Sequence, residues 1–267
     1  MKYTNKDHTF AICAYGESKY LEECIKSVKA QTIKTNIIMA TSTPNDYIKG
    51  LADKYEIKLF INTAKSNIAS DWNFAYKNAG TDLVTITHQD DIYKERYAES
   101  VINNFNKAAK PLIAFTDYSE LREGGVEVSD NKLLNIKRVM LSPLKIRGFW
   151  KSKFVRRRIL SFGSPICCPS VTFVKSNLPD EVFKVRFRGG VDWEAWEMIS
   201  RLKGSFVYCP EILMSHRIHE ESATTTIIAD NDRTKEDFEM FCRFWPKWIA
   251  KIIEHFYSDS EKQNELD

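Results

Sequence analysis

Two adjacent carboxylates, Asp90 and Asp91, directly follow a short apolar run at residues 83–87. The β-branched composition of this run predicts a buried strand that ends in an acidic loop. Open α/β sheets bind ligands beyond the carboxyl ends of their strands. Carboxylates placed there can hold a hard cation such as Mg²⁺ or Mn²⁺ that is shared with substrate phosphates. The alternative is a solvated acidic turn that caps the next helix, because Asp is also common at helix starts.

Two later clusters carry related chemistry. Asp192 and Glu194 follow a pair of glycines, and His216 and His219 follow a later apolar run. Each cluster has a structural alternative, since Asp192 is a good helix cap with Glu194 in the first turn, and either histidine fits an ordinary loop. Together with the first pair of carboxylates, the clusters suit a metal-assisted transfer. Such a reaction needs positive charge against a leaving diphosphate and a separate carboxylate that takes a proton from the attacking hydroxyl.

The elements that must position these residues alternate between strands and helices. Apolar runs predict strands at residues 9–14, 36–40, 57–61, 83–87, 111–116, 171–174 and 205–209, and helical spacing predicts helices at residues 66–79, 97–105 and 192–202. Alternation in the first half predicts βαβ units and a mostly parallel sheet flanked by helices. The absence of a GxGxxG motif and of a Walker A loop argues against a dinucleotide fold and a P-loop.

The composition is that of a globular protein, since 43% of the 267 residues are hydrophobic. A net charge of +3 gives no general case for nucleic acid as a partner. The sequence has no apolar run of about 20 residues, so no transmembrane helix is expected, and its polar start lacks a signal-peptide core. Six cysteines without a CxxC pair are expected to be reduced thiols and not zinc ligands. These features predict a cytoplasmic protein.

Several motifs occur in a fixed order along the chain. They are Phe10-Ala11-Ile12-Cys13-Ala14-Tyr15 with Leu21, Ser27 and Gln31-Thr32; Asn67-Ile68-Ala69-Ser70-Asp71-Trp72-Asn73; His88-Gln89-Asp90-Asp91; Val191-Asp192-Trp193-Glu194 with Trp196; and Arg217-x-His219-x-x-Ser222. Their order and spacing resemble a family 2 glycosyltransferase of the GT-A type over about residues 8–225. The resemblance implies the Rossmann-like GT-A fold, an α/β architecture with a mostly parallel central sheet.

The resemblance also implies a reaction and a set of roles. The enzyme would move a sugar from a nucleoside-diphosphate donor, with a UDP-sugar expected, to a saccharide or lipid-linked acceptor in cell-surface polysaccharide synthesis. Asp192 would be the general base of an inverting displacement, and Asp90, Asp91 and His219 would bind a divalent metal, Mn²⁺ or Mg²⁺. Donor contacts would come from Ala14, Tyr15, Glu17, Thr41, Ser42, Asn67, Asp71, Asn73, His88, Gln89 and Asp90. Trp193 and Glu194 would lie on the acceptor side.

Two positions depart from the family pattern. The second strand of the family usually ends with an Asp that contacts the nucleotide base, whereas this chain continues Thr41-Ser42-Thr43. A hydroxyl or a backbone group would then make the base contact. The first Asp of the family's DxD segment is His88 here. Metal binding would rest on Asp90 and a histidine, and the expected consequence is either a weaker metal affinity or a preference for a softer divalent ion such as Mn²⁺.

We expect residues 1–225 to form the glycosyltransferase domain, with a nucleotide-sugar half at 8–117 and an acceptor half at 118–225. Residues 226–267 would form a C-terminal helical extension, interrupted at Pro246. Residues 131–179 contain eleven Lys or Arg and no Asp or Glu. Basic and aromatic side chains alternate at residues 145–158, which predicts a peripheral contact with the inner face of the plasma membrane. A solvated basic face is the alternative.

Three other functions remain open from the residues alone. A nucleotidyltransferase would need a Gly-rich basic loop after the first strand, and the sequence Tyr-Gly-Glu-Ser argues against one. A glycoside hydrolase would use Asp90 and Asp192 as its carboxylate pair. A non-catalytic module that binds a nucleotide sugar is made possible by His88.

Overall fold

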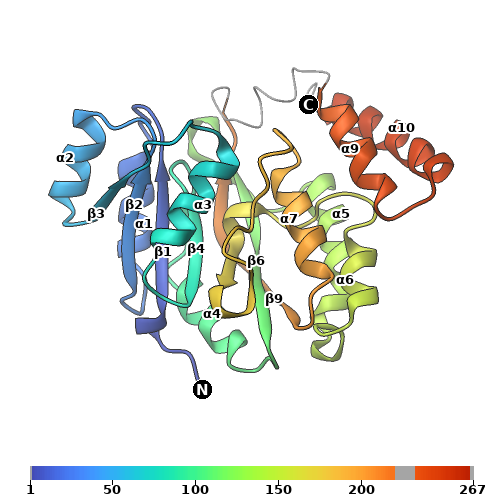
Figure 1. Ribbon diagram of the computed structural model, residues 1–267, viewed down its shortest axis with the longest axis horizontal. Coiled ribbons are helices and arrows are strands. Elements are labelled where there is room, and N and C mark those ends of the chain that lie inside the picture. Colours follow the sequence, from blue (N-terminus) through green and yellow to red (C-terminus); the bar gives the residue numbers. More distant parts are fainter. Residues whose placement is uncertain (1, 220–231, 265–267) are drawn as a thin grey trace.

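One mixed β-sheet forms the centre of the computed structural model, which describes residues 2–219 and 232–264 (Figure 1). The strands run in the order β3-β2-β1-β4-β8-β6-β9-β5, and β7 pairs with β6. Their bounds are β1 His8–Ala14, β2 Asn36–Thr41, β3 Lys58–Ile61, β4 Leu83–His88, β5 Ile92–Tyr93, β6 Pro111–Arg122, β7 Val126–Val128, β8 Val171–Val174 and β9 Ser205–Arg217. The helices are α1 Leu21–Lys29, α2 Asp46–Lys54, α3 Ile68–Asn78, α4 Tyr97–Phe105, α5 Lys132–Leu141, α6 Lys153–Ile159, α7 Val191–Ser200, α9 Asp232–Cys242 and α10 Lys247–Asn264.

The first four strands in the sheet order are parallel. β1 pairs with β2 and β4, and β2 pairs with β3. Phe10, Ile12 and Ile86 are fully buried, as expected for strands that are covered on both faces. The parallel sheet predicted for this half is therefore present, and the carboxyl ends of β1, β2 and β4 meet at one edge.

The second half of the sheet is mixed. β8 is antiparallel to both β4 and β6, and β6 is parallel to β9. The direction of β9 therefore matches that of β4, so its last residues reach the same edge of the sheet. This geometry brings two loops together that are more than 120 residues apart in the sequence.

The strand predicted at residues 205–209 continues to Arg217. Register shifts interrupt its pairing with β6, so that Cys209 pairs with Thr116 and Ile212 pairs with Asp117. Pro210 lies in the skipped segment, where its missing N–H does not interrupt a ladder bond. Because of this bulge, β9 continues past Pro210, and its last residues, including His216, lie at the site.

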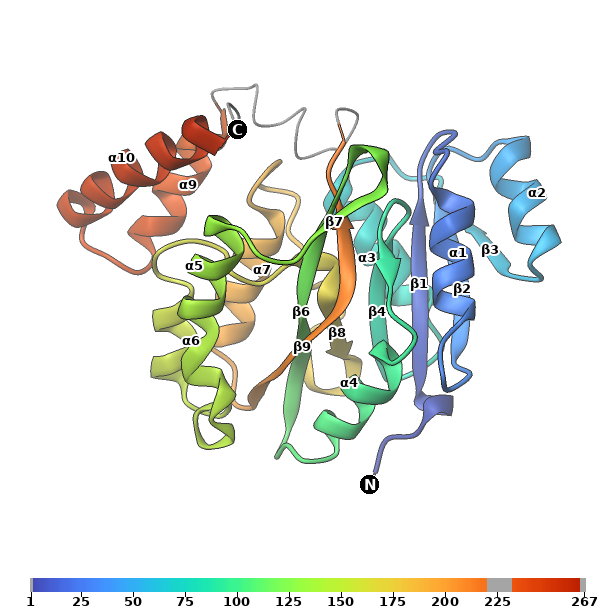
Figure 2. The same ribbon diagram turned by 180° about the vertical axis from the view of Figure 1, so that it is seen from behind.

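Helices cover both faces of the sheet. α3 and α7 lie on the face turned to the viewer in Figure 1, and α1 and α4 lie on the face seen in Figure 2. On α7, the indole of Trp196 stacks on Phe173 of β8 with ring centroids 5.8 Å apart. Tyr97 of α4 packs against Phe10 of β1 at 5.8 Å. These contacts fix one layer of helices on each face of the sheet.

The C-terminal helices α9 and α10 pack against α7. The ring of Phe241 meets the edge of Trp193 at 5.1 Å, and Arg243 pairs with the buried carboxylates of Glu194 and Glu197. The two helices are separated at Pro246, as predicted, while residues 226–231 and 265–267 of the expected extension lie outside the described residues. In the part of the chain that the structure describes, no helix is long and apolar enough to cross a membrane.

Candidate active site

Three potential metal ligands gather where β4 ends. One ligand atom from each of His88, Asp90 and Asp91 lies within 4.8 Å of the others. His88 is the last residue of β4, and the chain turns at once into β5. The alternative of a solvated acidic turn fails for Asp91, whose side chain is fully buried.

Asp91 is held from the end of β9. Its Oδ1 accepts hydrogen bonds from His216 Nδ1 at 3.0 Å and from the backbone N–H of Arg217 at 2.9 Å. Its Oδ2 is buried without a hydrogen-bond partner among the described residues and lies 3.7 Å from His88 Nδ1. Burial opposes ionisation, but the charge and hydrogen bond of His216 and the hydrogen bond from the Arg217 amide outweigh it and lower the pKa of Asp91. An ionised carboxylate therefore points one unsatisfied oxygen at His88.

The imidazole of His88 is favoured in its neutral form. Burial lowers its pKa more than the neighbouring Asp91 and Asp90 raise it, and its Nε2 is buried without a partner among the described residues. Neutral imidazole nitrogen and carboxylate oxygen are the donors that Mn²⁺ and related ions accept. The two atoms without a partner, Asp91 Oδ2 and His88 Nε2, are thus an oxygen and a nitrogen donor of the kinds that a divalent cation binds.

Asp90 faces the other histidine of β9 and its following loop. Its Oδ2 lies 3.0 Å from His219 Nε2, and its carbonyl accepts a hydrogen bond from Arg217 Nε at 2.8 Å. Arg217 also pairs with Glu23 of α1 at 2.6 Å and lies over the ring of Tyr20. The structure therefore brings His88, Asp90 and Asp91 together and places His219 beside Asp90. Ser222 of the same motif lies outside the described residues.

The expected donor residues at the end of β1 are tied to the same loop. The Gln89 side chain accepts from the N–H of Tyr15 at 2.9 Å and donates to its carbonyl at 3.0 Å. Tyr15 is 58% exposed, so its ring is open to a ligand. Ala14 is buried and pairs with Thr41 at the end of β2, and Glu17 is exposed in the loop. Gln89 thus sets the spacing between the β1 and β4 ends.

A carboxylate from α3 lies beside the end of β2. Asp71 of α3 accepts hydrogen bonds from Ser42 Oγ at 2.8 Å, from Ser66 Oγ at 2.9 Å and from Asn62 Nδ2 at 2.8 Å. Asn67 is the N-cap of α3, where its side chain accepts from the Ser70 N–H. This network places an acid beside the end of β2, where the family usually has an Asp and this chain has Thr41 and Ser42.

Asn73 has a structural role. Its amide donates to the carbonyl of Phe183 and accepts from the N–H groups of Val182 and Phe183. Both ends of the side chain are thereby used to hold the segment before α7, so a direct donor contact by Asn73 is not favoured by the geometry.

Asp192 lies in the first turn of α7 and is half-buried. Its Oδ1 accepts the backbone N–H of Trp193 at 2.7 Å. Burial and then the charge of Asp192 raise the pKa of the Cys168 thiol, and the same charge raises the pKa of His88 against the larger effect of burial. Asp192 therefore belongs to the same electrostatic neighbourhood as His88.

The two residues predicted for the acceptor side are placed elsewhere. Trp193 is 2% exposed and donates its indole N–H to the carbonyl of Leu160, and Glu194 is 3% exposed and pairs with Arg243. Consecutive residues of a helix point in different directions, so only Asp192 of this motif turns toward the site. An open acceptor contact by Trp193 or Glu194 is not supported.

Sequence reasoning missed the roles of two residues at the site. It noted His216 in a histidine cluster but gave it no role, and it left Trp72 unassigned. His216 orients Asp91, and Trp72 stacks on His88. Trp72 carried a signal because it lies inside a motif that the resemblance had singled out, whereas nothing in the sequence near His216 indicates its contact with Asp91.

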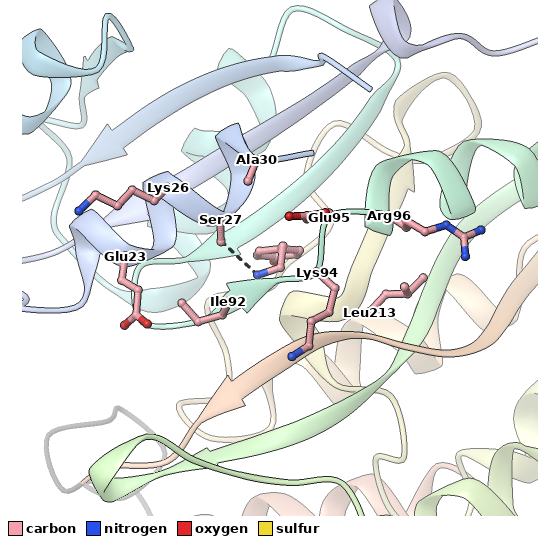
Figure 3. Close-up of a pocket in the computed structure, with 10 residues that line it drawn as sticks. Glu23, Lys26, Ser27, Ala30, Ile92, Lys94, Glu95, Arg96 and Leu213 are labelled. Carbon is pink, nitrogen blue, oxygen red and sulfur yellow. Dashed lines mark hydrogen bonds between the residues drawn. The ribbon is translucent and has the colours of Figure 1, made fainter. Parts of the chain in front are cut away.

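A large open cavity lies apart from these residues. Figure 3 shows it between α1, β5 and the start of α4, with a volume of about 660 Å³. Its lining includes Glu23, Ser27, Tyr93 and Arg96 but no candidate metal ligand and not Asp192. The hydroxyl of Ser27 accepts the N–H of Tyr93 at its base. The chemistry therefore does not coincide with this cavity.

Comparison with known proteins identifies the family of the chain and solved structures with a similar fold. A family model described as glycosyl transferase family 2 matches residues 9–176, more than half of the chain. A search of curated proteins found no match. S. aureus TarS is similar in structure, with a TM-score of 0.59, 12% identity and coverage of 95% of this chain. The chain spans only 42% of that TarS chain.

Two structures with bound nucleotide sugars are also similar. TarS 1–349 in complex with UDP-GlcNAc gives a TM-score of 0.60 at 12% identity and covers 95% of this chain and 70% of its own. The mannosyltransferase PcManGT from Pyrobaculum calidifontis, in complex with GDP-Man and Mn²⁺, gives 0.58 at 14% identity and covers 94% and 69%. At these identities the likeness concerns the fold, and it shows the GT-A arrangement of sheet and helices.

Proposed function

Because the chain belongs to glycosyl transferase family 2 and is a glycosyltransferase, we propose that it catalyses an inverting, metal-assisted sugar transfer from a nucleoside-diphosphate donor. The observation that carries this proposal is the group of His88, Asp90 and Asp91 at the carboxyl end of β4, and Asp192 supplies a further carboxylate from the first turn of α7. Open α/β sheets bind nucleotides at this edge.

A divalent cation would be held by Asp90, Asp91 and His88, with His219 beside Asp90. When bound, such a cation supplies positive charge against a leaving diphosphate. The chain's own residues prepare the site. His216 and the Arg217 amide fix Asp91, and Arg217 holds the Asp90 carbonyl, so the two carboxylates keep their positions before any ligand arrives.

Asp192 would act as the general base. Its carboxylate takes the proton of the acceptor hydroxyl as that oxygen attacks the anomeric carbon of the donor. The bond to the diphosphate breaks on the opposite side of the carbon, and the configuration inverts in one step. The half-buried setting of Asp192 keeps its carboxylate accessible to an acceptor while its Oδ1 stays fixed by the Trp193 amide.

Asp71 would read the nucleotide base. Ser42, Ser66 and Asn62 fix its carboxylate, and Oδ1 has a single hydrogen bond from Asn62 in this network. A carboxylate oxygen can accept more than one hydrogen bond, so Oδ1 could take the ring N–H of uracil. Asp71→Asn should lower affinity for UDP more than for CMP. Equal losses would exclude this assignment.

A peripheral membrane contact, and with it a location on the inner face of the plasma membrane, remains part of the proposal. Only some of the basic and aromatic side chains at residues 145–158 are exposed and could contact a membrane. Arg156 is buried and donates to the carbonyls of Gly204 and Leu202, and Arg157 pairs with Glu197. The cations and rings left exposed are Lys145, Arg147, Lys151, Lys153, Arg158, Phe149 and Phe154. Each exposed Lys or Arg would contribute about 1 kcal/mol near an anionic leaflet.

The membrane contact is tested with vesicles. Phe154→Ser combined with Lys151→Gln and Lys153→Gln should abolish cosedimentation with phosphatidylglycerol vesicles at low salt. Binding of the wild type to anionic and neutral vesicles to the same extent would refute the contact.

The transfer itself is tested with a mixture of saccharide and lipid-linked acceptors. The wild type should release nucleoside diphosphate and form a glycoside of inverted configuration. Asp192→Asn should reduce transfer at least about 100-fold and leave donor affinity within a few-fold. Release of free sugar from a simple glycoside, without a nucleotide, would instead indicate a hydrolase.

A further inference from the structure

Five of the eleven cations at residues 131–179 are not exposed, and all of these except Lys137 have an anionic or backbone-oxygen partner inside the fold. Arg138 pairs with Asp117 at 2.6 Å, and Arg157 pairs with Glu197. Lys175 donates to the carbonyl of Ala79 at 2.7 Å. Such contacts satisfy each cation with a carboxylate or with backbone oxygen. They leave one inward-facing cation of this stretch to be explained.

That cation is Lys137. It lies on α5 and is half-buried, and its Nζ donates to the phenol oxygen of Tyr118 at 2.8 Å. Among the described side chains no carboxylate lies within ion-pair distance of it. A phenol is a neutral partner and satisfies only one of the three ammonium donors. A partly buried ammonium in that state is stabilised by any anion that reaches it.

Lys137 is connected to the candidate metal ligands through Tyr118 and His216. Tyr118 presents its ring to His216 at 6.4 Å with the planes at 75°, and His216 in turn holds Asp91. Burial and then the charge of Asp91 raise the pKa of the Cys167 thiol, while the charge of Lys137 lowers it and that of Asp192 raises it. Lys137 thus belongs to the same electrostatic neighbourhood as Asp91 and Asp192.

We propose that Lys137, oriented by Tyr118, binds an anionic group of the acceptor next to the hydroxyl that Asp192 deprotonates. The acceptor is thus a hydroxyl compound, such as a saccharide, that bears a phosphate or a carboxylate. That the bound compound is the acceptor rests on the proposed function, whereas the binding of an anion by Lys137 does not require transfer activity. A cation at this place also keeps an anionic acceptor apart from the carboxylates, which would repel it.

Binding is measured by saturation-transfer NMR with glycerol 1-phosphate and, separately, with methyl glucuronide. Saturating UDP and Mg²⁺ are added in one series and omitted in the other. Lys137→Met should weaken binding of one probe about tenfold or more, since a charge-assisted hydrogen bond is lost. Lys137→Arg should retain most of it. The matched control Lys132→Met, an exposed lysine on the same helix, should change nothing.

The two probes distinguish a phosphate from a carboxylate as the natural group. Melting temperatures of Lys137→Met and Lys137→Arg within a few degrees of the wild type show that the fold is intact. Equal probe binding by wild type and Lys137→Met would overturn the proposal. So would a loss confined to UDP affinity, because Lys137 would then serve the donor. If UDP fails to bind any variant while the probes still depend on Lys137, the donor assignment fails and the anion site stands.

Discussion

The imidazole of His88 lies flat against the indole of Trp72, with ring centroids 4.9 Å apart and planes at 16°. Trp72 comes from α3 and is itself held at its edge by Phe183 at 5.0 Å. The stack fixes the plane of the imidazole while burial keeps it neutral. A nitrogen donor therefore occupies the position at which the family pattern has a carboxylate.

This arrangement predicts an altered metal preference. With nucleotide present, Mn²⁺ should stabilise the wild type more than Mg²⁺, because imidazole suits the softer ion. His88→Asp restores an oxygen donor and should reduce the Mn²⁺ over Mg²⁺ preference roughly tenfold. Metal titrations followed by melting temperature give the ratio, and His255→Asp on the exposed face of α10 serves as the control. An unchanged ratio in His88→Asp would show that His88 is not a ligand.

The hydrogen bond from His216 to Asp91 predicts a second effect on the metal. His216→Phe keeps a ring of similar size but removes the donor, and metal affinity should fall roughly 10–100-fold. His216→Asn offers an N–H to the same oxygen and should recover part of the loss. Both are measured as the Mn²⁺ concentration for half-maximal stabilisation in the presence of nucleotide. Full affinity in His216→Phe would mean that the Arg217 amide suffices to hold Asp91.

What could be predicted from the sequence depends on how far apart in the chain the contacting residues lie. Apolar runs located the parallel strands, and the metal group was evident because His88, Asp90 and Asp91 are neighbours in the chain. The bond between His216 and Asp91 spans 125 residues, and no local pattern records it. The strand β6 was predicted too short for a related reason. Ser119 and Glu120 are buried but polar, and their partners Ser215 and Asn131 come from elsewhere in the chain.

Buried His8 predicts a pH dependence of stability. Burial lowers its pKa from 6.5 to about 3, so between those pH values the unfolded chain binds a proton that the folded chain does not. Stability from this group is therefore complete above about pH 6.5 and falls as the pH drops, by about 1.4 kcal/mol per pH unit.

The measurement is the free energy of unfolding in urea at pH 7.5 and at pH 5. His8→Gln keeps a donor for the hydroxyl of Thr85, which lies 2.8 Å from His8 Nε2, and removes the titrating group. The variant should lose less stability than the wild type between the two pH values. An identical loss in both proteins would contradict a neutral buried His8.

The ion pairs of Arg243 predict that the C-terminal helices stabilise the catalytic domain. Arg243→Met leaves the buried carboxylates of Glu194 and Glu197 with one cation fewer, and the free energy of unfolding should fall by about 3 kcal/mol. Urea unfolding measures the change, with Lys251→Met at an exposed position of α10 as the control. Wild-type stability in Arg243→Met would indicate that α9 and α10 contribute little to holding α7.

The account depends most directly on a metal-dependent nucleotide site at the end of β4. We would measure the melting temperature with UDP-, GDP-, CMP- and dTDP-sugars, each with Mn²⁺ and with EDTA. Because ligand binding stabilises the folded state by mass action, one nucleotide class should raise the melting temperature in Mn²⁺, and EDTA or Asp91→Asn should abolish the shift. No shift with any donor, or a shift that survives both EDTA and Asp91→Asn, would contradict the proposed site.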